Sequence, residues 1–154
     1  MKENIALSLS IQYPDTRLKE VASRQQIRRW VRAALRQPAA LTIRFVNEAE
    51  GRTINRDFRQ KDYATNVLTF AYDAPPHETG KEAVAEADIV LCTDVIVSEA
   101  KAQKKTVKAH LAHLIIHGTL HAQGDDHEAE DEAEAMEALE TAILSRFGIA
   151  DPYA

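Results

Sequence analysis

Two hydrophobic periodicities alternate along this 154-residue chain, and they limit its architecture more than any other feature. Apolar residues occupy every second position from Ile5 to Tyr13, which is the pattern of a strand with one buried face. From Thr16 onward the spacing becomes helical, until Pro38 forbids continuation. We therefore expect a strand and then an amphipathic helix, with Trp30 in the core.

The rest of the chain continues the alternation. Apolar patterns predict strands at 41–47, 67–72 and 87–92. They predict helices at 48–58, from Thr93 or Asp94 to Ala102, from 107 onward, and from about Glu128 to Phe147. Either Thr93 or Asp94 could cap the second of these helices, and Thr106 is expected to cap the third. Gly148 is expected to end the last helix. Neither a repeat nor a linker interrupts the series. This indicates an α+β fold and a single domain over residues 1–154, in which a four-stranded mixed sheet packs against about five helices.

Composition excludes several classes of protein. The chain is 45% hydrophobic and 28% charged, as in ordinary globular proteins, and its net charge of −5 argues against wrapping DNA. Cys92 is the only cysteine, so an intramolecular disulfide is impossible, and we expect a buried side chain at a strand end. No segment approaches the roughly twenty apolar residues of a membrane span. We expect a cytoplasmic protein with no membrane or DNA partner.

The segment HGTLHAQGDDHE, residues 117–128, carries three histidines. His117 and His121 are four residues apart on the predicted long helix, which places them on one face with about 5 to 6 Å between their Cβ atoms. His127 can join them only if the chain turns back, and Gly124 is suited to that reversal because glycine adopts the left-handed conformation that ends helices. The pattern thus predicts a metal site at the end of the long helix.

Three imidazoles leave one coordination position for water, as in catalytic zinc sites, and water held there becomes acidic enough to yield hydroxide near neutral pH. Imidazole also suits nickel, copper or iron. The alternative is that the three histidines are ordinary surface or core residues that are close in sequence by chance and bind no metal. His110 and His113 lie further back on the same helical face, where they would be second-shell, cleft-wall or solvent residues.

The residue after the first histidine bears on the reaction. Metallopeptidases of the H-E-x-x-H type have a glutamate there as general base, whereas this chain has Gly118. Asp126 and Glu128 could orient an imidazole as second-shell carboxylates, or simply stabilise a helix N-terminus. A hydrolase without the peptidase base is therefore favoured.

These residues resemble a known family. HGTLHAQGDDHE is similar to the H-G-x-L-H-x-x-G-Y-D-H signature of the YbeY family of bacterial endoribonucleases, also called rRNA maturation factors. NRDFRQKDYATNVLTFAYD, ADIVLC and EALETAILSRFGIADPY resemble further segments of that family in the same order. Asp125, Asn66, Thr69 and Ala87 depart from its usual tyrosine, aspartate, serine and glycine. The first departure adds a negative charge beside the predicted metal, which could strengthen cation binding and repel a phosphate.

The resemblance implies that His117, His121 and His127 bind one Zn²⁺ per chain and that Arg59 acts in catalysis. It implies cleavage of single-stranded ribosomal RNA, in maturation of the 16S 3′ end and in ribosome quality control. The small ribosomal subunit, its proteins and an Era-type GTPase are the implied partners.

A basic group beside Arg59 agrees with an RNA substrate. Arg52, Arg56 and Lys61 fall on or just after the predicted short helix, and guanidinium can hold two phosphate oxygens at once. The alternative is a solvated helix face. For the whole protein, two other functions stay open: a ribosome-associated assembly factor with structural zinc, and a metallopeptidase without the usual glutamate.

Overall fold

The computed structural model describes residues 5–72, 84–124 and 130–153. The chain folds in the order β1 (Leu7–Gln12), α1 (Arg24–Ala34), β2 (Ala39–Val46), α2 (Glu48–Arg59), β3 (Val67–Tyr72), β4 (Ala85–Cys92), α3 (Thr93–Ala102), α4 (Val107–Ala122) and α5 (Glu130–Ser145). Each element was predicted from hydrophobic spacing, and most bounds differ from the prediction by only a few residues.

The four strands form one mixed sheet in the order β1-β2-β4-β3. The strands β1, β2 and β4 run parallel, with Ile11 beside Ile43 and Ile43 beside Ile89. The last strand, β3, runs antiparallel to β4 at the edge of the sheet. Helices and sheet pack as one unit, so the prediction of an α+β fold with a four-stranded mixed sheet is confirmed.

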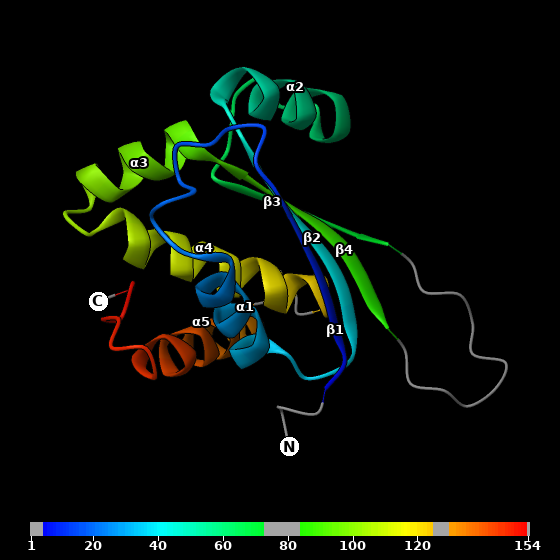
Figure 1. The fold of residues 1–154 in the computed structure, drawn as a ribbon. Helices are drawn as coiled ribbons and strands as arrows, with labels where there is room; N and C mark the ends of the chain where they lie inside the picture. The colour runs from blue at the N-terminus through cyan, green and yellow to red at the C-terminus, as the bar shows by residue number, and fades with distance from the viewer. Residues whose placement is uncertain (1–4, 73–83, 125–129, 154) are drawn as a thin grey trace, which may run out of the picture.

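Helices α1, α4 and α5 lie on the same side of the sheet, with α4 against the strands and α5 packed against α4 (Figure 1). The main hydrophobic core fills the space between them and includes Ile89 from β4, Ile115 from α4 and Trp30 from α1. Trp30 is 1% exposed, which confirms its predicted place in the core. Helix α4 is the innermost, because apolar residues cover most of its circumference.

Helix α2 lies beyond the opposite face, at one end of the sheet (Figure 1). A second, smaller core joins it to the strands through Val46, Val90 and Cys92, with Ile54 of α2 packed against them. Side chains alternate along β4, so Ile89 belongs to the main core and Val90 to the smaller one. Cys92 is buried, as predicted, and burial raises the pKa of its thiol.

Local capping explains where two helices begin. Thr106 caps α4 as predicted, with its Oγ1 accepting a hydrogen bond from the backbone N–H of Ala109 at 3.0 Å. The first helix begins at Arg24 rather than near Thr16, so the predicted start is wrong. Ser23 caps it by accepting a hydrogen bond from the backbone N–H of Gln26, which fixes the start of the helix eight residues after Thr16.

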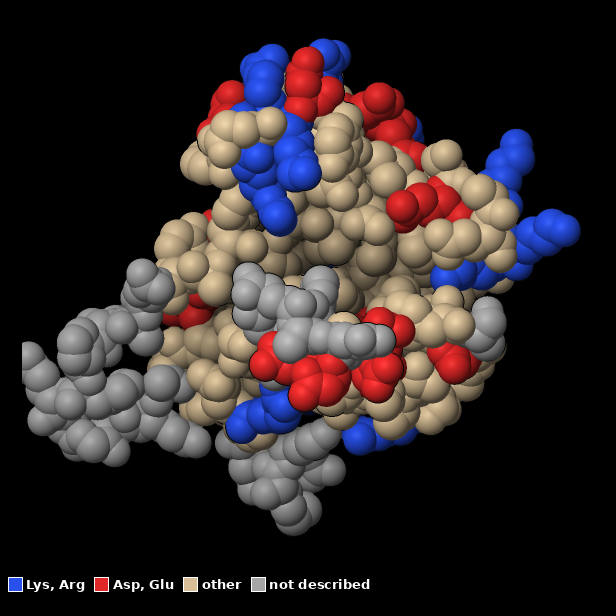
Figure 2. All heavy atoms as spheres, turned by 180° about the vertical axis from the view of Figure 1, so that it is seen from behind, with Lys and Arg blue, Asp and Glu red and all other residues tan. Residues whose placement is uncertain are grey.

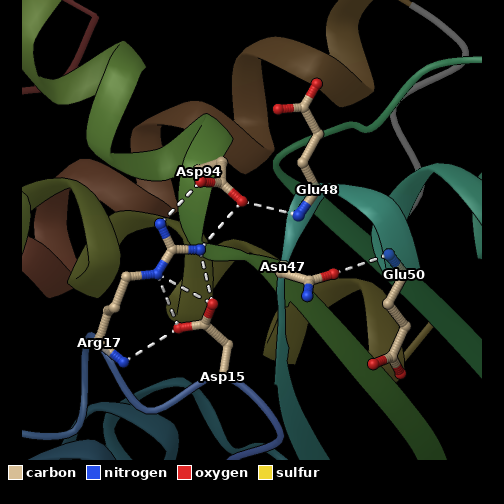
Figure 3. A network of polar contacts seen from close by, with 6 residues as sticks. All are labelled: Asp15, Arg17, Asn47, Glu48, Glu50 and Asp94. Carbon is tan, nitrogen blue, oxygen red and sulfur yellow. Dashed lines mark hydrogen bonds and ion pairs between the residues drawn. The ribbon is translucent and has the colours of Figure 1, made fainter.

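The prediction that Thr93 or Asp94 caps α3 is also wrong. The N-cap is Cys92, and no side chain caps the helix, because β4 leads into α3 without a loop. Asp94 is instead engaged with Arg17, whose guanidinium lies between Asp94 and Asp15 (Figure 3). Asp94 also accepts from the backbone N–H of Glu48 at 2.7 Å.

This Arg17 clamp, formed by Asp15, Arg17, Asp94 and Glu48 N–H, joins the loop after β1 to the first turns of α2 and α3. The shortest distances from the Arg17 guanidinium are 2.6 Å to Asp15 and 2.7 Å to Asp94. The hydrogen bonds from Arg17 are the leading cause that lowers the pKa of both carboxyl groups.

Among the described helices, none is both long and apolar enough to cross a membrane.

Candidate metal centre

Helix α4 carries two of the three predicted metal ligands, His117 and His121, and lies very close to the sheet. A Cβ added to Gly118 would stand 3.0 Å from Cγ2 of Ile89 and 3.4 Å from Oγ1 of Thr69. Position 118 therefore faces packed strands. A glutamate at this position would point into the sheet rather than toward a reacting group, so the missing peptidase base has a structural reason.

His117 and His121 lie one turn apart on α4 with their rings together. The ring centroids are 4.5 Å apart and the ring planes meet at 69°. The His117 side chain is 24% exposed, so this end of the helix is reached by solvent. Two imidazoles held this close can supply two nitrogen ligands to one cation.

The helix ends where the sequence predicted a reversal. Gly124 has φ of 93°, in the left-handed region, and its N–H donates to the carbonyl of His121 at 3.0 Å. The left-handed glycine is thus confirmed. His127, Asp126 and Glu128 lie outside the described residues, as does Asp125, so their predicted places stay predictions.

A buried carboxylate on α5 faces the histidines. Glu140 is 0% exposed and lies 2.7 Å from Nε2 of His113 through Oε1 and 3.0 Å from Nδ1 of His117 through Oε2. The phenol of Tyr153, in the C-terminal segment, donates to Oε1 at 2.7 Å. Together His113, His117 and Glu140 bring one ligand atom each to within 4.8 Å of one another, a grouping that could hold a metal ion.

Glu140 is ionised in spite of its burial. Burial favours its neutral form, but the hydrogen bonds from His113, His117 and Tyr153 outweigh that effect and lower its pKa to about 2. An ionised carboxylate only accepts hydrogen bonds, so the ring nitrogens that face it carry protons. In neutral His117 the proton then lies on Nδ1, and Nε2 is the nitrogen with the lone pair.

His113, predicted to lie behind the metal ligands, contacts both Glu140 and Tyr153. Its Nε2 is 3.0 Å from the Tyr153 oxygen, while its Nδ1 is buried without a hydrogen-bond partner among the described residues. His110, one turn earlier, is a separate case: its Nε2 lies 2.9 Å from Oε1 of Glu99, and burial lowers its pKa. His113 therefore contacts the Glu140 cluster, and His110 bonds to α3.

Sequence reasoning missed Glu140 as a functional residue. It follows Leu139 and lies four residues after Met136, on the stripe that also buries Ile143. A charged residue on the apolar face of a helix is unusual, because a buried carboxylate needs hydrogen-bond donors. The position of Glu140 within an apolar stripe was therefore the sequence signal that could have identified it as a functional residue.

The predicted basic residues gather on α2 and just after it. Arg59 ends the helix, is exposed, and forms no ion pair with any residue in the described ranges. Arg56 reaches Asp57 only at 3.5 Å, and Lys61 is exposed. Arg52 differs, because its guanidinium contacts both Asp62 oxygens at 2.8 and 2.9 Å.

The face opposite to that of Figure 1 shows these charges in relation to the rest of the surface (Figure 2). At the top of this face, over α2, lysine and arginine side chains gather with aspartate and glutamate side chains beside them. A further group of aspartate and glutamate side chains lies lower down, toward α5. The surface between the two groups is hollowed. A polyanion would be attracted to the lysine and arginine side chains of the upper rim and repelled by the acidic lower rim.

Comparison with known proteins identifies the family. The family model described as endoribonuclease YbeY matches residues 10–148. The chain belongs to the endoribonuclease YbeY family. It is accordingly a member of a family of enzymes, as the resemblance of its histidine motif predicted.

Individual relatives agree with this assignment. The endoribonuclease YbeY of Janthinobacterium sp. (strain Marseille) is 54% identical over 153 residues, which are 99% of this chain and 98% of the relative. That of Cupriavidus metallidurans is 56% identical over 150 residues, 96% of this chain and 74% of the relative. The solution structure of TM1509 from Thermotoga maritima shares the fold, with a TM-score of 0.54, 23% identity and 91% of each chain covered.

In this YbeY-family chain the donor set suits a transition metal better than a hard cation. Imidazole nitrogens are typical ligands of zinc, copper, iron and nickel, whereas calcium and magnesium prefer oxygen. Four ligands about 2.0–2.1 Å from zinc lie about 3.3 Å apart, and the contacts of Glu140, at 2.7 and 3.0 Å, are shorter. These contacts fit hydrogen bonds, so His117 and His121 are the better-placed candidate ligands among the described residues.

Proposed function

We propose that this chain is a zinc-dependent endoribonuclease that cleaves single-stranded ribosomal RNA, in 16S 3′-end maturation and in ribosome quality control. Membership of the endoribonuclease YbeY family carries the RNA-cleaving part of this proposal. The close pair of His117 and His121 supports the metal, with His127 as the third ligand. Residues 1–154 act as one domain.

The chain's own groups divide the work of cleavage. His117, His121 and His127 would hold one zinc ion, which supplies Lewis acidity that makes water a nucleophile near neutral pH. Arg59 holds two non-bridging phosphate oxygens and offsets the charge that grows on the phosphate during attack. Arg56 and Lys61 attract the RNA backbone, and Arg52 contributes less, because Asp62 already occupies its guanidinium.

Single-stranded RNA is the substrate that this surface favours. An unstacked strand can bend its phosphates into a hollow, whereas the deep major groove of an A-form duplex excludes side chains. The acidic residues toward α5 restrict the approach of RNA to the basic side (Figure 2). Asp126 and Glu128 are proposed to orient imidazoles, and His113 to support Glu140. The cytoplasm, the small ribosomal subunit and an Era-type GTPase are the proposed setting and partners.

Two measurements on purified protein test this function. Elemental analysis should find one zinc ion per chain, and single-stranded ribosomal RNA should be cleaved without chelator and spared with it. His121→Ala should lose both zinc and cleavage, while Lys108→Ala, an exposed residue on the same helix, should keep both. Far-UV circular dichroism checks that both variants are folded.

The alternatives predict other results. If folded His121→Ala still supports 16S maturation in cells, the protein is an assembly factor with structural zinc rather than a nuclease. Cleavage of a peptide library would instead indicate a metallopeptidase, which Gly118 argues against because position 118 faces the sheet.

A further inference from the structure

Glu140 is buried in a way that stability alone does not explain. Its side chain is 0% exposed on a helix whose neighbouring inward residues, Met136 and Ile143, are apolar. Removing a carboxylate from water is unfavourable, and apolar residues of similar volume often stabilise a core equally well or better. A charged residue at such a position needs a role that an apolar residue cannot perform.

The contacts of Glu140 divide between its two oxygens. Oε1 accepts from the Tyr153 phenol and lies 2.7 Å from Nε2 of His113. Oε2 lies 3.0 Å from Nδ1 of His117. The first pair of contacts fixes the plane of the carboxylate, and that leaves the second oxygen aimed at a single nitrogen of His117.

The C-terminal segment holds the phenol in place. Asp151 accepts from the backbone N–H of Tyr153 at 2.8 Å and from Oγ1 of Thr141 at 3.2 Å. Thr141 is next to Glu140 on α5, so the turn that carries Tyr153 is tied to the helix that carries the carboxylate. The orientation of Glu140 is therefore set by two separate parts of the chain.

From this geometry we propose that Glu140 is a positioning residue that acts through His117. It holds the Nδ1–H of His117, so that the Nε2 lone pair is directed toward the cation next to His121. This inference rests on the proposed function, because it takes His117 as a metal ligand. Carboxylates that hold the far nitrogen of a ligating histidine fix its tautomer and ring orientation and raise its basicity.

The chain contains a matched control for this contact. Oε1 of Glu99 lies 2.9 Å from Nε2 of His110, which makes a second carboxylate–imidazole contact to helix α4, seven residues before His117. Substitution of Glu99 removes a similar carboxylate–imidazole bond without touching His117. It separates loss of a buried hydrogen bond from loss of ligand orientation.

The experiment compares Glu140→Gln with Glu99→Gln. In Glu140→Gln the side-chain amide has one oxygen, so it cannot accept hydrogen bonds from both His113 and His117. Where its NH₂ group faces His117, it donates to Nδ1, and the ring proton moves to Nε2, the proposed ligand nitrogen. The Kd for zinc, measured by chelator competition, should rise about 10–100-fold. In Glu99→Gln the zinc Kd should not change, although both variants lose stability in urea. An unchanged zinc Kd in Glu140→Gln would overturn the inference.

A second measurement keeps the inference testable if Glu140→Gln does not fold. Long-range ¹H–¹⁵N spectra of the metal-free wild-type protein report which ring nitrogen carries the proton. His117 should be the Nδ1–H tautomer, and an Nε2–H tautomer would overturn the inference. A wild-type protein that binds no zinc, or binds zinc without cutting RNA, would contradict the proposed function instead, while the tautomer result would still stand.

Discussion

Two arginines on α2 differ in what they already bind. Arg52 and Arg59 are seven residues apart, or about two helical turns, so they lie on one side of the helix. Arg52 holds both oxygens of Asp62, which lowers the pKa of that carboxyl, whereas Arg59 has no carboxylate partner in the described ranges. A guanidinium without a carboxylate partner is the one better able to hold a phosphate.

Arg59→Ala should therefore lower kcat for single-stranded RNA by about 100-fold or more, the usual cost of removing one group that stabilises transition-state charge. Zinc affinity should stay the same, because Arg59 is not a ligand. Arg59→Lys should restore only part of the rate, since an ammonium cannot hold two oxygens in one plane. Steady-state kinetics and chelator competition measure the two quantities.

The matched variant is Arg52→Ala, whose loss of rate should be much smaller because Asp62 competes with the phosphate for that guanidinium. Equal losses in the two variants would mean that α2 supplies only a diffuse positive field. The special role of Arg59 would then be wrong.

Among the elements, α4 determines the proposed zinc site, because it carries His117 and His121 and ends beside them. Its N-terminus is fixed by Thr106 and its C-terminus by the left-handed Gly124. Gly148, after α5, is a second left-handed glycine, with φ of 71°. A Cβ at either position would meet nothing within 4 Å, so only backbone strain separates glycine from alanine there.

Gly124→Ala and Gly148→Ala should each lower the free energy of unfolding by about 1–2 kcal/mol, the cost of the left-handed conformation for a residue with a Cβ. Urea denaturation of the metal-free proteins measures this loss. Only Gly124→Ala should also weaken zinc binding, because our proposal is that a reversal at Gly124 brings His127 to the zinc site.

Two results of the comparison between Gly124→Ala and Gly148→Ala would contradict these expectations. Equal zinc affinity in the two variants would show that the reversal at Gly124 does not position His127. A stable Gly124→Ala would show that the helix can end another way.

At the scale of the whole molecule, the Arg17 clamp joins three segments that are distant in sequence: the loop after β1, the start of α2 and the start of α3 (Figure 3). Asp94 is 77 residues from Arg17 along the chain. The clamp keeps α2, with its arginines, in a defined place at the end of the sheet.

Arg17→Met should lower Tm at pH 7, and the difference from wild type should shrink in acid. The pKa values of Asp15 and Asp94 lie below their usual value of 3.8 in the folded protein, chiefly because of the hydrogen bonds from Arg17. The stability they contribute is complete above that value and is lost as the pH falls through the lowered pKa values. Thermal melts at several pH values measure the difference.

Arg29→Met is the control, because Arg29 is exposed on α1 and has no carboxylate partner among the described residues. Its Tm should follow that of wild type at every pH. A pH-independent deficit in Arg17→Met would show that the clamp acts by packing rather than by charge.

Local patterns in the sequence were sufficient for much of this protein. Strand and helix periods, the cap at Thr106, the left-handed Gly124 and the pairing of His117 with His121 all depend on residues no more than about four positions apart. Interactions of that range leave a period or a spacing in the sequence. The histidine motif also carried the family assignment.

Longer-range features were decided only when the chain folded. The bonds from His113 and His117 to Glu140 join residues 27 and 23 positions apart, and the Arg17 clamp spans 77. The order of strands and the antiparallel direction of β3 likewise follow from packing between distant segments. A side chain's burial and partners depend on what packs against it, and a glutamate on an apolar stripe acquires its role only when two imidazoles and a phenol reach it.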